Sequence, residues 1–480
     1  MAKKQNKTGG RAATTGHIAG DYALSVGMPP TAAPSGWKWT LLTDVARLET
    51  GHTPSRKFPE YWDGDVPWIG IRDATGNHGQ TIHETNQYTT DLGIENSSAR
   101  ILPANTVCLS RTASVGYVIV MGKPMATSQD FVNWVCSDDL DYRFLMYVLL
   151  AEKRSFLRFA HGTTHQTIYF PEVKAFHICL PPIEEQRAIA SILGALDDKI
   201  ELNRRMNATL ESLARAIFKS WFVDFDPVHA NAIRQNAGKT GAGQMPASSA
   251  IPTTHDPKVL DLFPSTFQDS ELGPIPDGWN AMPVSEAVEI NPRRTLAKGT
   301  IAKYLDMKNV PTQGHRPNEI IDREMKSGTK FINGDTLMAR ITPCLENGKT
   351  AFVDFLSDGE VGWGSTEFIV MRPRSPLPNE FGYFLARDPD VRQHAIKNMT
   401  GTSGRQRVAK ECFDAYLIAV PNEDVADEFA KVVDPIMATM RTASRESAEL
   451  AKLRDTLLPQ LLAGDVPVPE ALTATEEALV

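Results

Sequence analysis

Two short glycine-containing stretches concentrate side chains that suit phosphate groups and the edges of bases. GTTHQTI begins at Gly162 and GTSGRQRV begins at Gly401. Hydroxyls and loop amides suit phosphate oxygens, Asn and Gln suit adenine, and Arg and Lys suit guanine and phosphate. Because both stretches place these groups at the same point of two similar sequence blocks, we predict a nucleic-acid contact in each block.

Further basic and hydroxyl side chains lie in turn-like segments of the two blocks. The candidate DNA-binding residues of the first block are Arg56, Lys57, Arg72, Arg111, Thr112, His161, Thr163, Thr164, His165 and Gln166. The candidates of the second block are Arg293, Arg294, Arg340, Thr342, Thr402, Ser403, Arg405, Gln406 and Arg407. For any one of them, the alternative is a solvated surface residue without a ligand.

No catalytic motif accompanies these residues. The two GKT stretches, at Gly238 and Gly348, lack the earlier glycine of a phosphate-binding loop. HETNQ at His83 lacks the second histidine of a zinc-protease helix. A G-x-S-x-G elbow, a dinucleotide-binding glycine pattern and the [DN]-P-P-[YF] run of amino-methyltransferases are also missing from the sequence. The sequence therefore predicts no catalytic residue, no metal site and no cofactor in this chain.

Composition narrows the class of protein. The five cysteines lie far apart without a C-x-x-C pair, which argues against a zinc site or a disulfide framework and fits the cytoplasm. No run of 18 apolar residues predicts a membrane span, and the basic N-terminus lacks the apolar segment of a secretory signal. The net charge is −8, but residues 423–480 hold most of the excess acid. Since both central blocks are nearly neutral, net charge does not exclude DNA.

The two blocks form an internal repeat. PSGW at Pro34 recurs as PDGW at Pro276, and TSQDFVNWV at Thr127 resembles STEFIVM at Ser365. NTVCLSR and GDTLMAR, which end at Arg111 and Arg340, are a third pair. Short β-branched and aromatic runs predict strands, and helical stretches follow at 142–160 and 380–399. We therefore expect an α+β chain with two similar mixed domains.

Each block is followed by an apolar seam with spacings of four and three residues. The first seam is Ile189, Leu193, Leu196, Ile200, Asn203, Asn207, Leu210, Ala214, Ile217 and Trp221. The second is Phe429, Val433, Ile436, Met440, Ala443, Ser447, Leu450, Arg454, Leu457 and Leu461. Such a repeat predicts two long helices that pair along their seams. The alternative is that each seam packs only on its own domain. We expect Arg454 to face an acid such as Asp197 or Asp198, or a partner subunit.

These observations predict seven segments. They are a flexible N-terminal tail at 1–33, a first domain at 34–182, a helix at 183–227, a linker at 228–273, a second domain at 274–421, a helix at 422–466 and a C-terminal tail at 467–480. The linker is placed by its Ala, Gly, Ser, Thr and Pro content.

Three stretches resemble the specificity subunits of Type I restriction–modification systems. LPPIEEQRAIASILGALDDKIELNRRMNATLESLARAIFKSWFVDFDPV is similar to their central conserved region, and FPSTFQDSELGPIPDGW to the entry of their second target-recognition domain. LRDTLLPQLLAGDV is similar to their C-terminal conserved region. The resemblance extends over nearly all of residues 34–466.

The resemblance implies a non-catalytic DNA-reading subunit with a pseudo-two-fold internal repeat. In the family, two target-recognition domains each read half of a bipartite double-stranded target, and the conserved helices pair antiparallel as a coiled coil. Two modification (methyltransferase) subunits dock on these helices, and restriction (translocase–nuclease) subunits complete the enzyme. S-adenosylmethionine, ATP and Mg would belong to those partners. Alternatives are an orphan specificity subunit that serves modification only or another phage-defence complex, a self-contained nuclease or methyltransferase, and a coiled-coil adaptor without DNA binding.

Overall fold

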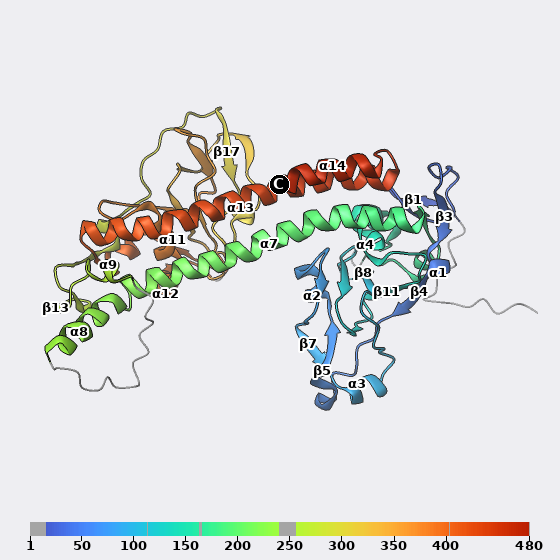
Figure 1. The fold of residues 1–480 in the computed structure, drawn as a ribbon, viewed down its shortest axis with the longest axis horizontal. Coiled ribbons are helices and arrows are strands. Elements are labelled where there is room, and N and C mark those ends of the chain that lie inside the picture. Colours follow the sequence, from blue (N-terminus) through green and yellow to red (C-terminus); the bar gives the residue numbers. More distant parts are fainter. Residues whose placement is uncertain (1–15, 113, 163–165, 240–255, 403, 480) are drawn as a thin grey trace, which may run out of the picture. The chain divides into compact units, whose positions relative to one another are not determined.

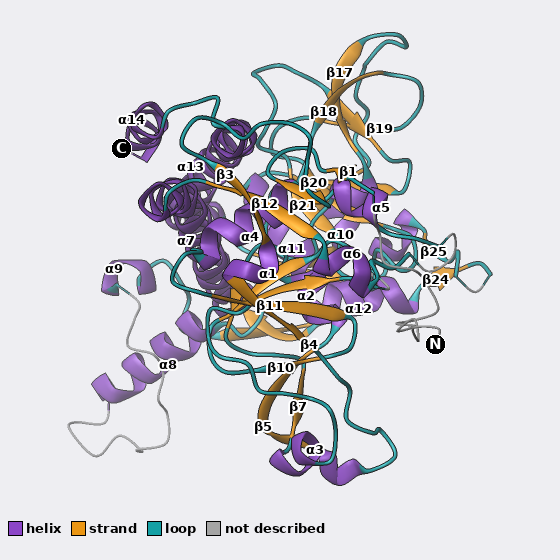
Figure 2. Ribbon diagram, turned by 90° about the vertical axis from the view of Figure 1, so that its right-hand side faces the viewer, coloured by secondary structure: helices purple, strands orange, loops and turns teal. Residues whose placement is uncertain are grey.

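The computed structural model describes residues 16–112, 114–162, 166–239, 256–402 and 404–479 of the 480-residue chain (Figure 1). The chain divides into two compact units. Unit 1 comprises residues 1–200 and 448–480, and unit 2 comprises residues 201–447. Each unit contains a mixed domain of short strands and helices (Figure 2) together with one part of two long helices, α7 (Ile183–Phe222) and α13 (Glu423–Ala463).

The domain of unit 1 is built on three sheets. Its strands are β1 (Ile18–Ala19), β2 (Leu24–Val26), β3 (Lys38–Leu41), β4 (Ala46–Thr50), β5 (Trp62–Ile69), β6 (Thr81–Ile82), β7 (Gln87–Thr89), β8 (Val107–Ser110), β9 (Val118–Met121), β10 (Ala126–Thr127), β11 (Phe131–Cys136) and β12 (Phe176–Leu180). Its helices are α1 (Leu42–Val45), η1 (Pro59–Tyr61), α2 (Ile71–Gly76), α3 (Asp91–Glu95), α4 (Tyr142–Ala151), α5 (Ser155–Phe159) and α6 (Phe170–Lys174). The strand orders are β1-β2-β12-β3, β10-β5-β7 and β4-β11-β8-β9-β6.

The domain of unit 2 has corresponding elements. Its strands are β13 (Phe267–Ser270), β14 (Gly273–Pro276), β15 (Asn280–Pro283), β16 (Val288–Ile290), β17 (Ile301–Leu305), β18 (Ile321–Glu324), β19 (Thr329–Phe331), β20 (Thr336–Ala339), β21 (Thr350–Phe352), β22 (Gly362–Gly364), β23 (Phe368–Pro373), β24 (Met399–Thr400), β25 (Arg407–Val408) and β26 (Leu417–Val420). Its helices are α8 (Asp226–Lys239), α9 (Pro257–Leu260), α10 (Val284–Ala287), η2 (Met307–Asn309), α11 (Asn379–Arg387), α12 (Pro389–Lys397) and η3 (Lys410–Asp414).

The strand pairing confirms the repeat. The antiparallel order β4-β11-β8-β9 in unit 1 recurs as β16-β23-β20-β21 in unit 2. The antiparallel pair β3–β12 recurs as β15–β26, and the parallel pair β5–β10 recurs as β17–β22. Each domain therefore returns, through its last strand, to the start of a long helix.

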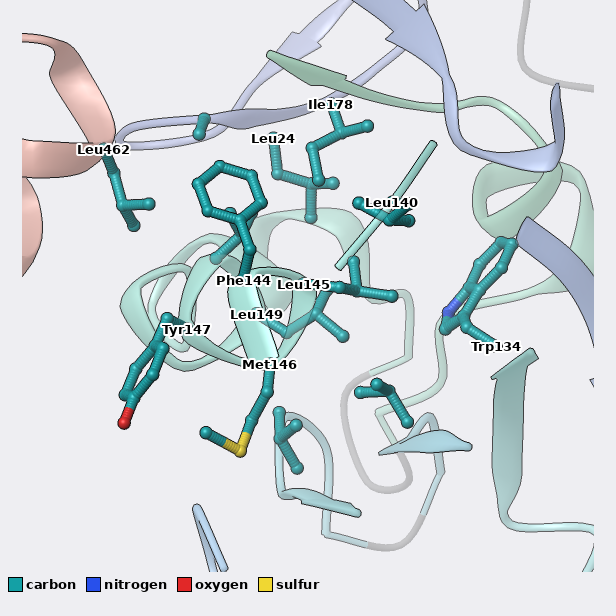
Figure 3. Packing of buried hydrophobic residues seen from close by; sticks show 14 of the residues in the cluster. Leu24, Trp134, Leu140, Phe144, Leu145, Met146, Tyr147, Leu149, Ile178 and Leu462 are labelled. Carbon is teal, nitrogen blue, oxygen red and sulfur yellow. The ribbon is translucent and has the colours of Figure 1, made fainter. Parts of the chain in front are cut away.

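The core of unit 1 joins a helix to a sheet and to the C-terminal part of α13. Phe144, Leu145 and Leu149 of α4 are fully or almost fully buried, and they share one apolar cluster with Trp134 and Leu462 (Figure 3). Aromatic and branched side chains at i, i+1 and i+5 of a short helix can cover a sheet on one side and a helix on the other.

The long helices pair along the predicted seams, and in each unit they run antiparallel. In unit 2, Asn203 of α7 lies beside Ala443 of α13, whereas Phe222 lies beside Phe429. In unit 1, Ile189, Leu193 and Leu196 of the first seam share the core cluster with Leu450, Leu457 and Leu461. Every predicted seam position is buried or half-buried, so the seams pair as predicted while they also pack on their own domains.

The polar seam positions make specific contacts. The Asn203 amide donates to the Glu446 carboxylate at 2.7 Å, and the Asn207 amide donates to the Ser444 hydroxyl at 3.0 Å. Arg454 Nη1 donates to Asp197 Oδ1 at 2.6 Å, which confirms one of the expected acidic partners. Such polar layers favour one register of two paired helices.

The predicted N-terminal tail is wrong for residues 16–33. This segment contributes β1 and β2 to the sheet of β12, and Leu24 and Val26 are buried. The completely buried carboxylate of Glu152 accepts the backbone N–H groups of Asp21 and Tyr22, each at 2.7 Å. The short apolar run ALSV can add a strand because the sheet offers it an edge and the Glu152 carboxylate offers a buried acceptor. Residues 1–15 lie outside the described part of the chain.

The predicted linker and C-terminal tail also need correction. Helix α8 occupies 226–239, and the amide of Asn231 donates to the backbone oxygens of Leu260 and Phe263, at 2.6 and 2.9 Å. Residues 240–255, which hold most of the Gly- and Ser-rich stretch, lie outside the described residues. The C-terminal segment forms α14 (Val468–Leu479), which buries Ala471 in the core of unit 1.

Candidate nucleic-acid interface

In unit 1, the strand that ends at an arginine meets the glycine loop predicted from the sequence. The hydroxyls of Thr112 and Thr167 lie 2.8 Å apart, and the backbones of these two residues form a bridge. A second bridge, between His161 and Thr167, closes the base of the loop. Arg111 directly precedes this junction, and Gln166 is exposed on the loop. Two segments that are far apart in the sequence are thus brought together, and they hold four candidates: Arg111, Thr112, His161 and Gln166.

Unit 2 repeats this arrangement. The N–H of Gln406 donates to the Thr342 hydroxyl at 3.0 Å, and the N–H of Thr342 donates to the Gln406 carbonyl at 3.0 Å. The carbonyl of Arg340 accepts the N–H of Val408 at 2.9 Å. The strands β24 and β25 form a small hairpin, with Arg405 exposed near its tip. The exposed Thr402 lies on the same hairpin.

Some predicted residues are outside the description. They are Thr163, Thr164 and His165 of the first loop and Ser403 of the second. For the remaining candidates, the structure gives position and surroundings. Their contact with DNA stays a prediction.

Comparisons with known proteins find specificity subunits of Type I restriction enzymes. Residues 34–212 match the family model described as the Type I restriction modification DNA specificity domain. The chain is 24% identical over 448 residues to the Type I restriction enzyme MjaIX specificity subunit of Methanocaldococcus jannaschii, over 91% of this chain and 95% of that protein. It is 26% identical over 483 residues to the HindI specificity subunit of Haemophilus influenzae, over 90% of this chain and 100% of that protein.

Residues 34–212 thus match the DNA specificity domain, and nearly the whole chain is similar to Type I restriction enzyme specificity subunits. The fold agrees with this. The crystal structure of the Type I restriction–modification S subunit from M. genitalium is similar with a TM-score of 0.50 at 15% identity, over 88% of this chain and 96% of that one.

The surroundings of Arg111 limit the orientation of its guanidinium. Its Nη2 donates to the Gln129 carbonyl at 3.0 Å, and its guanidinium lies 4.7 Å from the centre of the Phe170 ring. Burial lowers the pKa of Arg111, although the neighbouring Asp130 opposes this shift. The guanidinium is therefore held in one orientation by a carbonyl and an aromatic face, which restricts the direction in which its other N–H groups can point.

His161 lies beneath the first loop rather than on its surface. Its Nε2 is 3.5 Å from the buried carboxylate of Glu172, and its ring stacks on Tyr169 with centroids 6.5 Å apart. This side chain is half-buried. Its position supports the base of the loop, while Gln166 offers the exposed amide.

The remaining candidates of unit 1 are exposed. The Arg56 guanidinium lies 3.6 Å from the centre of the Trp62 ring and donates to the Gln87 side chain at 2.8 Å. Lys57 follows it in the same loop, and Arg72 lies on α2. Stacking fixes the plane of Arg56, so that the edge of its guanidinium is presented to solvent.

Two of the basic candidates in unit 2 are held by ion pairs, whereas Arg293 is exposed. Arg294 Nη2 donates to Asp335 Oδ1 at 3.2 Å, and its side chain is only 18% exposed. Arg407 donates to both oxygens of Glu367, with Nη2 2.7 Å from Oε1. Arg294 is consequently part of a buried cluster, while Arg407 remains at the surface of the hairpin.

Sequence reasoning missed Arg323 and Lys330. Arg323 of β18 lies over the ring of Tyr304 at 4.6 Å, just as Arg56 lies over tryptophan in unit 1. Tyr304 and Trp68 occupy equivalent positions on the parallel strands β17 and β5. An alignment of the two repeats on these aromatic strands could have indicated Arg323. Lys330 has no such signal, because only the pairing of β19 with β22 brings it beside the other cations.

Two absences hold for the residues that the structure describes. Within these ranges, no cluster of three or more His, Cys, Asp or Glu side chains could hold a metal ion. No helix of the described chain combines the length and the apolar character needed to cross a membrane.

Proposed function

We propose that this chain is the DNA sequence-recognition subunit of a Type I restriction–modification enzyme. Each unit would read one half of a bipartite double-stranded target, chiefly in the major groove. The observation that carries this proposal is the duplication itself, since both units join an arginine-ending strand to an exposed hairpin or loop of polar side chains. Such loops supply the hydrogen-bond donors that base edges and phosphates accept.

The paired helices would set the distance between the half-sites. Helix α7 has 40 residues and α13 has 41, so that each is about 60 Å long. Half-sites on one face of DNA are separated by about 34–36 Å or a multiple of it. A helix pair with a fixed register suits this task better than a flexible linker, which would let two domains read independently.

The helices would also carry the modification subunits. On α7, Leu202, Met206 and Leu213 are 60%, 37% and 51% exposed, and their spacing of four and seven residues places them on one face. This stripe lies apart from the seam that contacts α13. Apolar side chains exposed in a row on a helix are typical of contacts with a partner helix.

Catalysis would belong to the partners. Methylation with S-adenosylmethionine would take place on the modification subunits, and ATP- and Mg-dependent translocation and cleavage on the restriction subunits. The complex would act on DNA in the cytoplasm.

One experiment separates reading from assembly. The chain and its modification subunit are co-expressed, the complex is captured through the chain, and methylated adenines are mapped by sequencing. We expect Arg405→Ala with Gln406→Ala to keep the modification subunit but to relax or abolish one half-site, because the exposed Arg405 and the half-buried Gln406 of the hairpin offer base-reading groups. We expect Leu213→Lys to lose the modification subunit. Identical methylation patterns from the wild type and the double variant would contradict the assignment of this hairpin.

A further inference from the structure

A cavity of about 400 Å³ opens on unit 2 beside the end of β20. The polar side chains that line it are those of Asn291, Arg294, Thr329, Lys330, Arg340 and Thr366. Three of these residues are cations, and no carboxylate is among the described lining residues. The cavity therefore offers N–H and O–H donors and positive charge to whatever enters it.

Two of the donors have no partner within the described chain. The Nε–H groups of Arg294 and Arg340 are buried and make no hydrogen bond there. Buried polar groups in folded proteins are nearly always hydrogen-bonded to protein, water or ligand. Two unpaired guanidinium donors in one cationic cavity indicate that an acceptor from outside the chain completes the site.

Arg294 is held in place from below. Its Nη2 bonds to the fully buried Asp335, whose Oδ1 also accepts from Arg372 Nε at 2.7 Å and whose Oδ2 accepts the Ile332 N–H at 2.8 Å. The carboxylate is thus shared by two arginines and one amide. Since two positive charges meet one negative charge, the cluster keeps a net positive charge next to the cavity.

Arg340 is held through its backbone, and its guanidinium forms no ion pair with any residue of the described ranges. Its N–H donates to the Glu367 carbonyl at 3.0 Å, and its carbonyl accepts from Val408. The Glu367 carboxylate, which could have neutralised it, is bonded to Arg407. The side chain of Arg340 is thereby positioned at the cavity with its charge available to a ligand.

Among the described residues, the corresponding arginine of unit 1 has different surroundings. The equivalent arginine, Arg111, also has a buried Nε–H without a hydrogen bond among the described residues, but its Nη2 is bonded to the Gln129 carbonyl and its guanidinium packs on Phe170. Thr106 stands where Asp335 stands in the repeat. The contacts of these two arginine side chains therefore distinguish the two otherwise similar units within the described residues.

We infer that this cavity binds an oxygen-rich acceptor of the DNA target, either a backbone phosphate or the O6 and N7 edge of a guanine. The inference rests on the proposed function and deepens it, because it assigns one contact to unit 2 alone. Arginine pairs with both groups through two parallel N–H donors, and a cavity lined by three cations strengthens such charge-assisted bonds. Lys330 adds a point charge, and the threonine hydroxyls can bond to remaining lone pairs.

The test uses the full-length chain with fluorescently labelled duplex DNA at several salt concentrations, followed by selection and sequencing of bound duplexes from a random pool. The variants are Arg340→Gln and Lys330→Gln, the second in case the half-buried arginine is needed for folding. Arg374→Gln is the control, because this exposed arginine belongs to the same unit but does not line the cavity.

We expect Arg340→Gln to weaken DNA binding at least tenfold. If the ligand is a phosphate, affinity falls on every sequence and the slope of log affinity against log salt decreases by about 1. If the ligand is a guanine, the selected sequences lose one base preference, with a loss on the preferred duplex of roughly 10- to 100-fold. Unchanged affinity, salt slope and selected sequence in both cavity variants overturn the inference.

A second arm separates this inference from the proposed function. Thermal unfolding of each chain is compared in sodium phosphate and in sodium chloride of equal ionic strength. A phosphate-specific rise in Tm that Arg374→Gln keeps and Arg340→Gln loses supports the cavity even if the wild-type chain binds no DNA. If the wild type binds no DNA and shows no such rise, both the proposed function and the cavity ligand are wrong.

Discussion

Replacing Arg454 by leucine should destabilise unit 1, and replacing Asp197 by asparagine in the same chain should recover most of the loss. Arg454 interrupts the apolar seam of α13, and its Nη1 donates to Asp197 Oδ1 at 2.6 Å. The Tyr147 hydroxyl donates to the other oxygen of Asp197 at 2.8 Å. Although burial works against the charged guanidinium, Asp197 and Asp455 raise the pKa of Arg454. Leucine at position 454 would remove the guanidinium donor. Of the two donors named here, only the Tyr147 hydroxyl would then bond to the Asp197 carboxylate.

The expected magnitude follows from how exposed the pair is. The side chains of Arg454 and Asp197 are 29% and 28% exposed. Exposed ion pairs contribute about 0.2–1 kcal/mol, whereas removing one partner of a buried pair costs about 3–5 kcal/mol. For this partly buried pair we expect a loss of about 2 kcal/mol in Arg454→Leu. In the double variant, asparagine still accepts from Tyr147 and leucine continues the seam, so the loss should stay below about 1 kcal/mol.

The assay is a double-mutant cycle on the thermal unfolding of the full chain, followed by calorimetry and circular dichroism. For a folding unit of 150–250 residues, 1 kcal/mol corresponds to about 2–4 °C, so the single leucine variant should lower the transition of unit 1 by about 4–8 °C. The transition of unit 2 should not move. Lys452→Leu is the matched control, because it places leucine on an exposed position of the same part of α13.

Two outcomes would refute this reasoning. If Arg454→Leu is as stable as the wild type, the pair contributes nothing and the polar layer is only tolerated. If the double variant is as unstable as Arg454→Leu alone, the loss of stability comes from the way leucine packs in the seam and not from an unpaired Asp197 carboxylate. A coupling energy of about 1–2 kcal/mol distinguishes both cases from the expected one.

Two further predictions concern the helices and the N-terminal segment. Deleting one heptad from each helix, Asn203–Thr209 with Arg441–Ser447, shortens the helix pair by about 10 Å, which is the length of about three base pairs. Methylation of the native target should then be lost, and any target that is still methylated should have a shorter spacer. Unchanged spacing in methylation sequencing would contradict the role of the helices, and a seven-residue deletion at 247–253 is the control. Glu152→Ala should release the strands β1 and β2, because it removes a buried acceptor of backbone N–H groups; limited proteolysis should then cut between residues 16 and 33, and equal protection of the variant and the wild type would count against this.

The long helices could be predicted from the sequence because one rule governs them. The heptad spacing specifies which side chains meet, and it prevails even over Pro435 and Pro459, which lie inside α13 although proline disfavours a helix interior. The acid partner of Arg454 was predictable for the same reason, since an interruption of a seam must face a complementary side chain.

The N-terminal strands and α8 were missed because their stability comes from distant partners. Leu24 and Val26 form a short apolar run with no periodicity of its own, and Glu152, whose carboxylate accepts the Leu24 N–H, is more than 120 residues away. The composition of 228–273 averages a helix with a Gly- and Ser-rich stretch. Local composition therefore predicts the linker but not helix α8, which precedes it.

The position of the candidate site could be predicted from the sequence, but the contacts of its arginine side chains could not. The repeat placed Arg111 and Arg340 at equivalent strand ends. The sequence could not show that the Arg111 guanidinium is bonded to a carbonyl and packed on an aromatic ring, whereas that of Arg340 has neither contact among the described residues. This difference depends on Asp335 and Glu367, which hold other arginines. Two units with the same scaffold can consequently present different donors at the same point. Under the proposed function, the repeated fold would account for the reading of two half-sites, and the unequal contacts of equivalent arginines would account for a difference between the two sequences that are read.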